Sequence, residues 1–158
     1  KDRILYERYL EHYRQNQGVS QSCLFPSQLS LNPTDFDLVL SIKNEIQMLG
    51  FEFEPFGKNC IIINGIPPEI GKLSEKDLFE GLIEQFKMNQ SEIALNKTEN
   101  LARSMAKRTA IKISEKLDEE EISKIFDLLF ACKQPNYTPN GQATFVVLSI
   151  DKMISLFN

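Results

Sequence analysis

Histidine and cysteine are scarce in this sequence, and their scarcity excludes two classes of small domain. The 158 residues contain one histidine, His12, and three well-separated cysteines, Cys23, Cys60 and Cys132, with no C-x-x-C pair. A disulfide framework needs paired cysteines, and a structural zinc module needs several closely spaced Cys or His ligands. We therefore expect reduced cysteines, typical of a cytoplasmic protein, and no bound metal.

Excess positive charge and long apolar runs are also absent. Eighteen Lys and Arg stand against 22 Asp and Glu, which gives a net charge of −4 and a pI of about 5.1. Proteins that bind DNA unaided usually carry a basic excess, because phosphate neutralisation dominates their affinity. Tight DNA binding by this chain alone is not expected. One segment is locally basic, either as a solvated helix face or as a weak DNA-facing patch: Arg103, Lys107, Arg108 and Lys112.

The hydropathy pattern predicts neither a membrane span nor a signal peptide in this sequence. No run approaches the roughly 18 consecutive apolar residues of a membrane span, and no signal-peptide pattern is present. The sequence opens on Lys1 and enters a helical pattern at once. We expect it to be a piece of a longer protein.

What the sequence does contain is an alternation of helical and strand patterns, in a composition that is 42% apolar and typical of globular domains. Apolar spacing predicts helices over 3–15, 34–49, 75–87, 97–112 and 119–131, and a short last helix capped by Asp151 and ending at Phe157. Strands are predicted over 23–31, 51–56, 60–64 and 143–150, the last being the most β-like run. The order indicates a mixed α+β fold.

One pentapeptide is the most specific motif. Gln21-Ser22-Cys23-Leu24-Phe25, closed by Pro26, fits the pattern Q-x-x-L-[FI]. Many replication and repair proteins insert such a peptide into a pocket on the bacterial sliding clamp. A proline suits an edge strand or a bulge, which would keep the peptide accessible. The alternative is an ordinary buried strand, since apolar strand residues usually pack.

Over nearly its whole length the chain resembles the C-terminal domain of MutL, the DNA mismatch-repair protein. Gln21, Leu24 and Pro26 match the family's clamp-binding Q-x-[LV]-[LIV]-x-P segment, and 51–57 resembles its G-F-E-x-E-P-F-G hairpin. The resemblance implies a two-lobe α+β domain. An external lobe with a small sheet and helices, 21–96, would be inserted into a discontinuous dimerisation lobe, 1–20 plus 97–158.

The metal-site motifs of the family's endonucleases are degraded here. In D-Q-H-A-x-x-E-x-x-x-x-E the first glutamate becomes Asp2, while Glu7 matches the second. The cysteine of A-C-[KRH] becomes Lys107, and the cysteine and histidine of C-P-H-G-R-P become Thr138 and Asn140. Neutral threonine and asparagine are weak metal ligands, and a lysine repels a cation. We therefore expect no catalytic residue, no metal ligand and no endonuclease activity.

Two alternatives to these expectations remain open. Asp2 and Glu7 lie about 140° apart around an ideal helix and cannot easily share one ion, so we expect a solvated charge and a local salt-bridge partner. A metal-dependent nicking endonuclease with an atypical site, built on Asp2 plus upstream residues, is the alternative function. A clamp-tethered interaction module from an unrelated repair protein is a third.

Together, the helices predicted over 1–15 and 119–131 and the strand predicted over 143–150 offer more apolar surface than a small lobe can hide. A symmetric dimer would bury it, although a monomeric core is the alternative. The candidates for a dimer interface are Ile122, Ile125, Phe126, Leu129, Phe145 and Val147. The resemblance implies a homodimerisation domain whose partners are a second copy, the sliding clamp, the mismatch-recognition protein MutS and, mainly through the full-length protein, DNA. It implies no cofactor here, with ATP and Mg in the N-terminal ATPase domain of full-length relatives, and a bacterial cytoplasmic, nucleoid-associated location.

Overall fold

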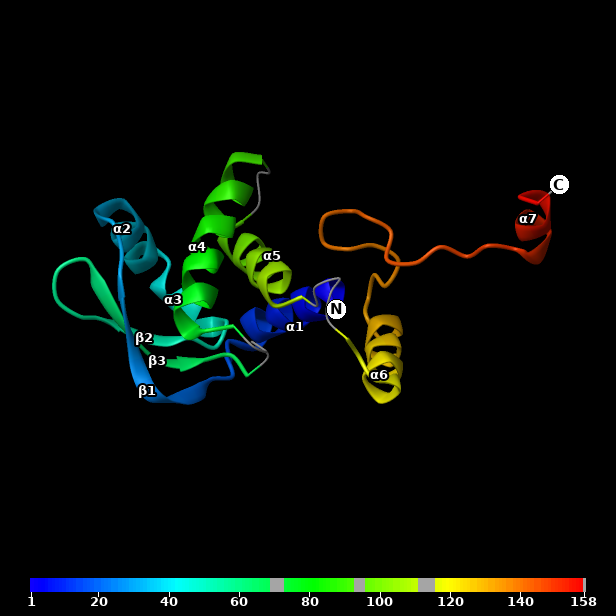
Figure 1. The fold of residues 1–158 in the computed structure, drawn as a ribbon. Helices are drawn as coiled ribbons and strands as arrows, with labels where there is room; N and C mark the ends of the chain where they lie inside the picture. Colours follow the sequence, from blue (N-terminus) through cyan, green and yellow to red (C-terminus); the bar gives the residue numbers. More distant parts are fainter. Residues whose placement is uncertain (69–72, 93–95, 111–115, 158) are drawn as a thin grey trace.

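The computed structural model describes residues 1–68, 73–92, 96–110 and 116–157 (Figure 1). Within these ranges it is a mixed α+β fold of seven helices and one three-stranded sheet, which confirms the predicted class. The elements in chain order are α1 (Asp2–Gln15), β1 (Gln21–Ser30), α2 (Pro33–Ser41), α3 (Lys43–Met48), β2 (Glu52–Pro55), β3 (Cys60–Ile66), α4 (Glu75–Glu92), α5 (Lys97–Thr109), α6 (Glu119–Phe130) and α7 (Ile150–Ser155).

The helix predicted over 34–49 is in fact two helices. It begins as the sequence suggests, because Pro33 occupies the first turn and the Asn32 side chain accepts a hydrogen bond from the Asp35 amide. Ile42 then leaves the helical region, with φ −121° and ψ 23°, while its side chain is fully buried. The break lets α2 and α3 approach the core at different angles.

Gly50 follows α3 with a φ of +103°, a conformation that glycine adopts without strain. A Cβ there would lie 2.1 Å from the Val19 carbonyl oxygen, so the residue also permits a close backbone approach.

The prediction of a strand over 143–150 is wrong. These residues are extended, but they join no sheet among the described residues, and α7 begins at Ile150. A β-rich sequence forms a strand only where a neighbouring strand offers free backbone groups. The cap also lies two residues earlier than predicted: the Ser149 hydroxyl, rather than Asp151, accepts the Lys152 amide.

The sheet has the order β1–β3–β2, and both pairings are antiparallel. The predicted hairpin is confirmed as β2 and β3. Its turn uses two positive φ values, at Gly57 and Asn59, where glycine and asparagine are favoured. The sheet is therefore a hairpin with β1 added along the β3 side.

A single hydrophobic core joins the sheet to the helices. Phe51 and Phe53 meet the Phe79 ring of α4 edge to face, at centroid distances of 5.3 and 5.1 Å. Leu5 of α1 and Met105 of α5 belong to the same cluster, and α5 packs against both α1 and α4. The division into an external lobe and a dimerisation lobe stays a prediction.

The elements that follow α5 lie apart from this core. Neither α6 nor α7 contains a buried residue. Figure 1 shows α6 beside the body and α7 at the far end of an extended segment. No described helix is long and apolar enough to cross a membrane.

Candidate functional site

The pentapeptide at 21–25 forms a bulge at the edge of the sheet. Ser22 pairs with Gly65 and Ser27 pairs with Ile63, so the four residues 23–26 lie opposite Asn64 alone. Extra residues on one strand push the backbone out of the ladder and increase its bend. Pro26 fits this place because it has no N–H to donate to the ladder. The edge or bulge predicted from Pro26 is confirmed.

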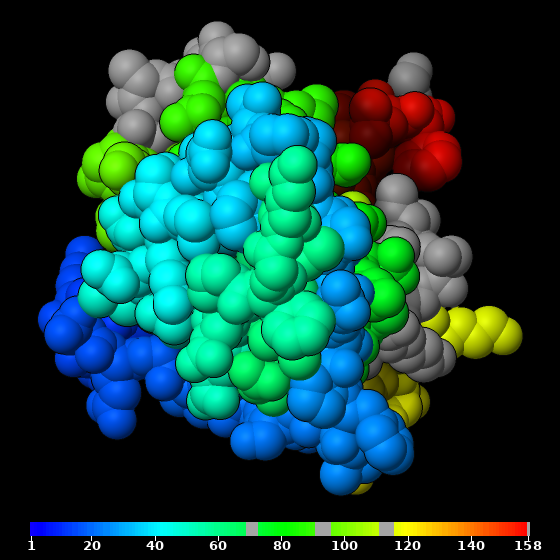
Figure 2. Space-filling model, turned by 90° about the vertical axis from the view of Figure 1, so that its left-hand side faces the viewer, coloured from blue at the N-terminus to red at the C-terminus, as the bar shows by residue number. Residues whose placement is uncertain are grey.

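The bulge presents two large apolar side chains to solvent. Leu24 is 94% exposed and Phe25 is 84% exposed. By contrast, Cys23, which precedes them in the chain, packs against the core. Gln21 and Pro26 are also exposed. In Figure 2, β1 lies at the molecular surface beside the β2–β3 hairpin. A buried strand, the alternative weighed for this peptide, is thus excluded for Leu24 and Phe25.

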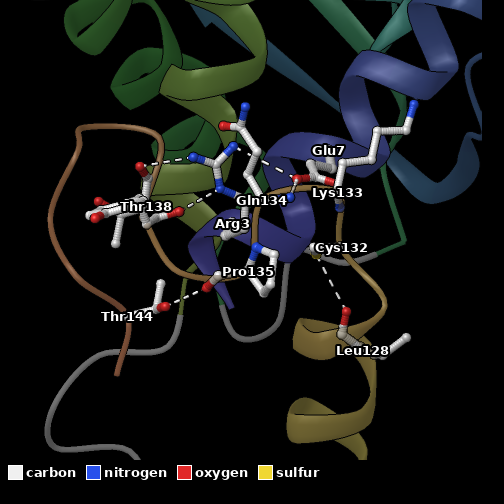
Figure 3. A network of polar contacts seen from close by, with 10 residues as sticks. Arg3, Glu7, Leu128, Cys132, Lys133, Gln134, Pro135, Thr138 and Thr144 are labelled. Carbon is white, nitrogen blue, oxygen red and sulfur yellow. Dashed lines mark hydrogen bonds and ion pairs between the residues drawn. The ribbon is translucent and has the colours of Figure 1, made fainter. Parts of the chain in front are cut away.

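A second site, which is polar, joins α1 to the loop after α6, as Figure 3 shows. The Arg3 guanidinium donates to the carbonyl oxygens of Tyr137 (2.6 Å) and Thr138 (2.9 Å). One turn further along α1, the Glu7 carboxylate accepts the backbone N–H groups of Lys133 (2.7 Å) and Gln134 (3.1 Å). We call this set of contacts the Arg3–Glu7 clasp.

In the clasp, the Glu7 carboxylate has a structural role and does not act as a metal ligand. Arg3 and Glu7 also form an ion pair at 3.8 Å, which confirms the local salt bridge. Each Glu7 oxygen already accepts a backbone N–H, so the carboxylate has a structural use. Arg3 was not singled out from the sequence. Its only local sign is a cation one turn before a glutamate on the same helix.

Asp2 is not the solvated charge expected from the sequence. Its Oδ1 atom is buried and has no hydrogen-bond partner among the described residues. Burial raises the pKa of its carboxyl group above 3.8, although the positive charges of Arg3, Lys107 and Arg103 act in the opposite direction. The fold thus brings Asp2 near Lys107 of α5, two positions that lie 105 residues apart in the sequence.

The other two degraded positions lie in the loop that the clasp holds. The Thr138 hydroxyl accepts the Gln142 amide at 3.1 Å and so closes a local turn, and Asn140 is exposed. No group of three or more His, Cys, Asp or Glu in the described part of the chain could hold a metal ion. Thr138 therefore stabilises a turn at a position where the endonuclease relatives are expected to carry a metal ligand.

A shallow hollow lies over the clasp, between α1 and residues 131–134. Its volume is about 370 Å³, and its walls carry both signs of charge. The residues that line it are Arg3, Tyr6, Glu7, Leu10, Glu11, Arg14, Ala131, Lys133 and Gln134. The Arg3 guanidinium lies 5.4 Å from the Tyr6 ring centroid, so this cation of the hollow is already engaged within the protein.

The basic segment on α5 is also partly committed to internal contacts. The Arg108 guanidinium donates to the Asp77 carbonyl at 2.9 Å and lies directly against Gly81 of α4. Lys107 is exposed, and Lys112 lies outside the described residues. One member of the set therefore ties α5 to α4, as a structural contact within the body.

The proposed interface residues of α6 form an exposed apolar stripe. Ile122, Phe126 and Phe130 recur every four residues, and all three are exposed. Ile125 and Leu129, on the adjoining face, are half-buried. Beyond α6, Phe145 packs against Phe130 at 5.3 Å between ring centroids, and Val147 is 84% exposed.

We predict that Asp2→Asn raises the melting temperature at pH 7. A raised pKa means that the folded state holds the carboxyl proton more tightly than the unfolded state, so ionisation costs stability as pH rises through the raised value. The amide removes that cost. Below the pKa of the unfolded state, about 3.8, the carboxyl group is protonated in both states and the two proteins should melt alike.

Thermal unfolding from pH 3 to 7 measures this difference, with Asp37→Asn on the exposed face of α2 as the control. A lower melting temperature at pH 7 would show instead that the nearby cations dominate.

The fold and these sites define a mixed α+β domain that exposes large apolar side chains at the β1 bulge and along α6. The chain belongs to the MutL family: residues 1–117 match the family model of the MutL C terminal dimerisation domain. It is 33% identical over 156 residues to the DNA mismatch repair protein MutL of Pelodictyon phaeoclathratiforme. Over the same length it is 34% identical to MutL of Chlorobium phaeobacteroides and 33% identical to MutL of Chlorobaculum parvum.

These matches cover the chain and the relatives unequally. Each of the three alignments covers 99% of this chain but 25% of the relative. The chain thus spans about a quarter of the length of the curated relatives it matches. The family model ends near α6, whereas the full-length alignments also include α6, the extended segment and α7.

Proposed function

We propose that this chain is a homodimerising C-terminal domain of a mismatch-repair MutL protein that docks on a sliding clamp through its β1 bulge. Membership of a dimerisation-domain family supports the first part. The exposure of Leu24 and Phe25 at the bulge is the observation that supports docking on the clamp. Two apolar side chains held at the tip of a bulge can enter a cleft on a partner without unfolding the sheet.

The clamp contact would combine apolar burial with one polar contact. Leu24 and Phe25 fill the pocket, and the exposed Gln21 amide forms hydrogen bonds at its rim. Because Cys23 packs against the core and Ser27 returns to the β3 ladder, both ends of the peptide are held in place. Such preorganisation lowers the entropy lost on binding.

The dimer would use the exposed apolar stripe of α6. Exposed apolar patches of this kind mark protein contacts in soluble proteins. A twofold symmetric dimer buries the same stripe on both copies. The proposed surface comprises Ile122, Ile125, Phe126, Leu129, Phe145 and Val147, of which Ile122, Phe126 and Val147 are exposed in the single copy.

This domain would not cut DNA. Glu7 is engaged by backbone amides, Lys107 puts a positive charge near Asp2, and Thr138 closes a turn. The buried Oδ1 of Asp2, without a hydrogen-bond partner among the described residues, is the one observation that favours an atypical metal-dependent nicking site. Nicking of supercoiled plasmid by the chain with Mn²⁺, lost in Asp2→Asn, would favour that second function.

In the whole protein, the domain would hold two copies together while N-terminal ATPase domains bind ATP and Mg²⁺. Two linkers tied at this dimer would form a ring able to close around DNA. Recruitment by the mismatch-recognition protein MutS and docking on the clamp would direct it to replicated DNA in the bacterial cytoplasm.

We expect Phe126→Glu to convert the dimer into a monomer. A carboxylate placed in an apolar interface must be desolvated without a partner, which costs several kcal/mol and corresponds to at least about 100-fold weaker association. Light scattering after size-exclusion chromatography measures the mass, which should fall from near twice 18.2 kDa to 18.2 kDa.

The matched control for this variant is Phe56→Glu. Phe56 and Phe126 are equally exposed, at 53%, but Phe56 lies at the tip of the β2–β3 hairpin. It should leave the mass unchanged. A Phe126→Glu protein that remains a dimer at every dilution would remove α6 from the interface, and a wild-type monomer would contradict homodimerisation itself.

A further inference from the structure

The segment 146–157, which we call the arm, is the part of the described chain with the least support from the body. Its root is well held: the Thr144 amide donates to the Asn136 carbonyl at 3.0 Å, the Thr144 hydroxyl donates to the Pro135 carbonyl, and Phe145 packs on Phe130. Beyond Phe145 the chain runs away from the body to α7 (Figure 1). The arm therefore leaves from a fixed point at the end of α6.

The composition of the arm does not suit exposure to water. Eight of its twelve residues are Val, Leu, Ile, Met or Phe, and they include Val146, Val147, Leu148, Ile150, Met153, Ile154, Leu156 and Phe157. All of these side chains are exposed, from 43% for Met153 to 91% for Phe157. A six-residue helix is too short to be stable alone, because nucleation costs more than so few hydrogen bonds return. The arm needs a surface to cover it.

The arm's own α6 is poorly placed to be that surface. To reach the stripe of Ile122 and Phe126, the chain would have to turn back toward α6 after Phe145, whereas Figure 1 shows it running away from α6. Residues 143–157 contain neither glycine nor proline, the residues that most readily form tight reversals. The observed path is extended up to the Ser149 cap. Local sequence thus favours an arm that continues outward.

We propose that the arm is exchanged between two copies, so that the arm of one copy packs on the α6 stripe of the other. This rests on the proposed homodimer, and the match of residues 1–117 to a dimerisation-domain family makes a second copy of this chain the occupant. A twofold axis near the ends of the two α6 helices would make the exchange reciprocal. Residues 144–149 span about 16 Å when extended, close to the roughly 18 Å length of a twelve-residue helix, so the arm can reach along the stripe.

The exchange also explains why both surfaces are exposed in a single copy. The stripe of Ile122, Phe126 and Phe130, which only Phe145 contacts at Phe130, and the apolar side chains of α7 are exposed in the described chain. Crossed packing would bury the two together, twice per dimer, and would stabilise α7 by tertiary contact.

Truncation after Phe145 tests the exchange directly. Removing the exposed arm should leave the thermal unfolding of the body close to that of the intact chain, but it should weaken dimerisation at least about 100-fold because several apolar side chains lose their partner surface. Light scattering over a dilution series gives the association constant. The double variant Leu24→Ala/Phe25→Ala is the control: it removes exposed apolar groups elsewhere and should remain a dimer.

A cross-link between copies gives a second, independent readout. A photoreactive benzophenone side chain at position 154, in a mixture of ¹⁴N- and ¹⁵N-labelled protein, should give cross-linked peptides of mixed isotope that join α7 to α6. A truncated protein that dimerises like the intact chain, or cross-links to α6 of one isotope only, would overturn the exchange while leaving homodimerisation intact. A monomeric intact chain would overturn both.

Discussion

Replacing Leu24 and Phe25 together by alanine is expected to abolish measurable binding to a bacterial sliding clamp and to leave the domain folded. Each side chain contributes roughly 1.5–3 kcal/mol when fully buried in an apolar pocket. The pair should therefore weaken binding by about 10²- to 10⁴-fold. The fold should not change, because both side chains are almost fully exposed in the free protein and contribute little to its core.

Fluorescence anisotropy with labelled clamp measures the affinity, and circular dichroism with a thermal melt checks the fold. Gln21→Ala should weaken binding about fivefold, since a rim hydrogen bond contributes roughly 1 kcal/mol. Phe56→Ala is the matched control, because it removes an exposed aromatic ring from the same sheet. Clamp affinity that is unchanged in the double variant would remove the bulge from clamp binding altogether.

Arg3→Ala should destabilise the domain by about 3 kcal/mol, because removing one partner of a buried charged network leaves the others unsatisfied. Arg3 is buried, and its loss would strand two carbonyl oxygens, those of Tyr137 and Thr138. It would also remove the cation beside Glu7. Arg3→Lys should recover only part of the loss, since an ammonium group lacks the planar fork that reaches both carbonyls.

Chemical denaturation measures the change in the free energy of unfolding. The control is Arg14→Ala on the same helix, whose exposed ion pair with Glu11 should contribute less than about 1 kcal/mol. Hydrogen exchange adds a local readout: the Lys133 and Gln134 amides should lose protection as the clasp loosens. Equal effects of the two substitutions would show that the clasp adds no stability beyond a surface ion pair.

The clasp supports the proposed dimer surface but not the proposed clamp bulge. Through Arg3 and Glu7, α1 holds the loop that joins α6 to the arm, so it fixes the position of the proposed dimer surface relative to the body. The clamp bulge lies on the sheet, at a different part of the same core. A weakened clasp should therefore impair dimerisation while leaving the bulge intact.

The sequence predicted the bulge better than it predicted the site around α1. Local signals sufficed for the bulge: Pro26 in a strand pattern, and apolar residues that a sheet edge exposes. No local pattern announces the clasp, because Arg3 bonds to backbone carbonyls 134 and 135 residues away. Side-chain contacts with distant backbone leave no periodic trace. For the same reason Asp2 was expected in solvent, whereas packing beside α5 buries its Oδ1.

The sequence by itself determined the elements whose causes are local. Asn32 and Pro33 start α2, Gly50 ends α3, and the 57–59 turn closes the hairpin, since capping and turn conformations depend on adjacent residues. It also carried the resemblance by which the family was recognised, and the family model confirms that recognition.

Only the tertiary structure decided the features that depend on distant partners. The 143–150 run has strand propensity but no neighbouring strand among the described residues, so it is extended up to the start of α7. Ile42 interrupts a helix whose periodicity looked continuous, because its burial in the core requires a change of direction. Propensity acts within a few residues, whereas burial and pairing are settled by contacts that only the folded chain brings together.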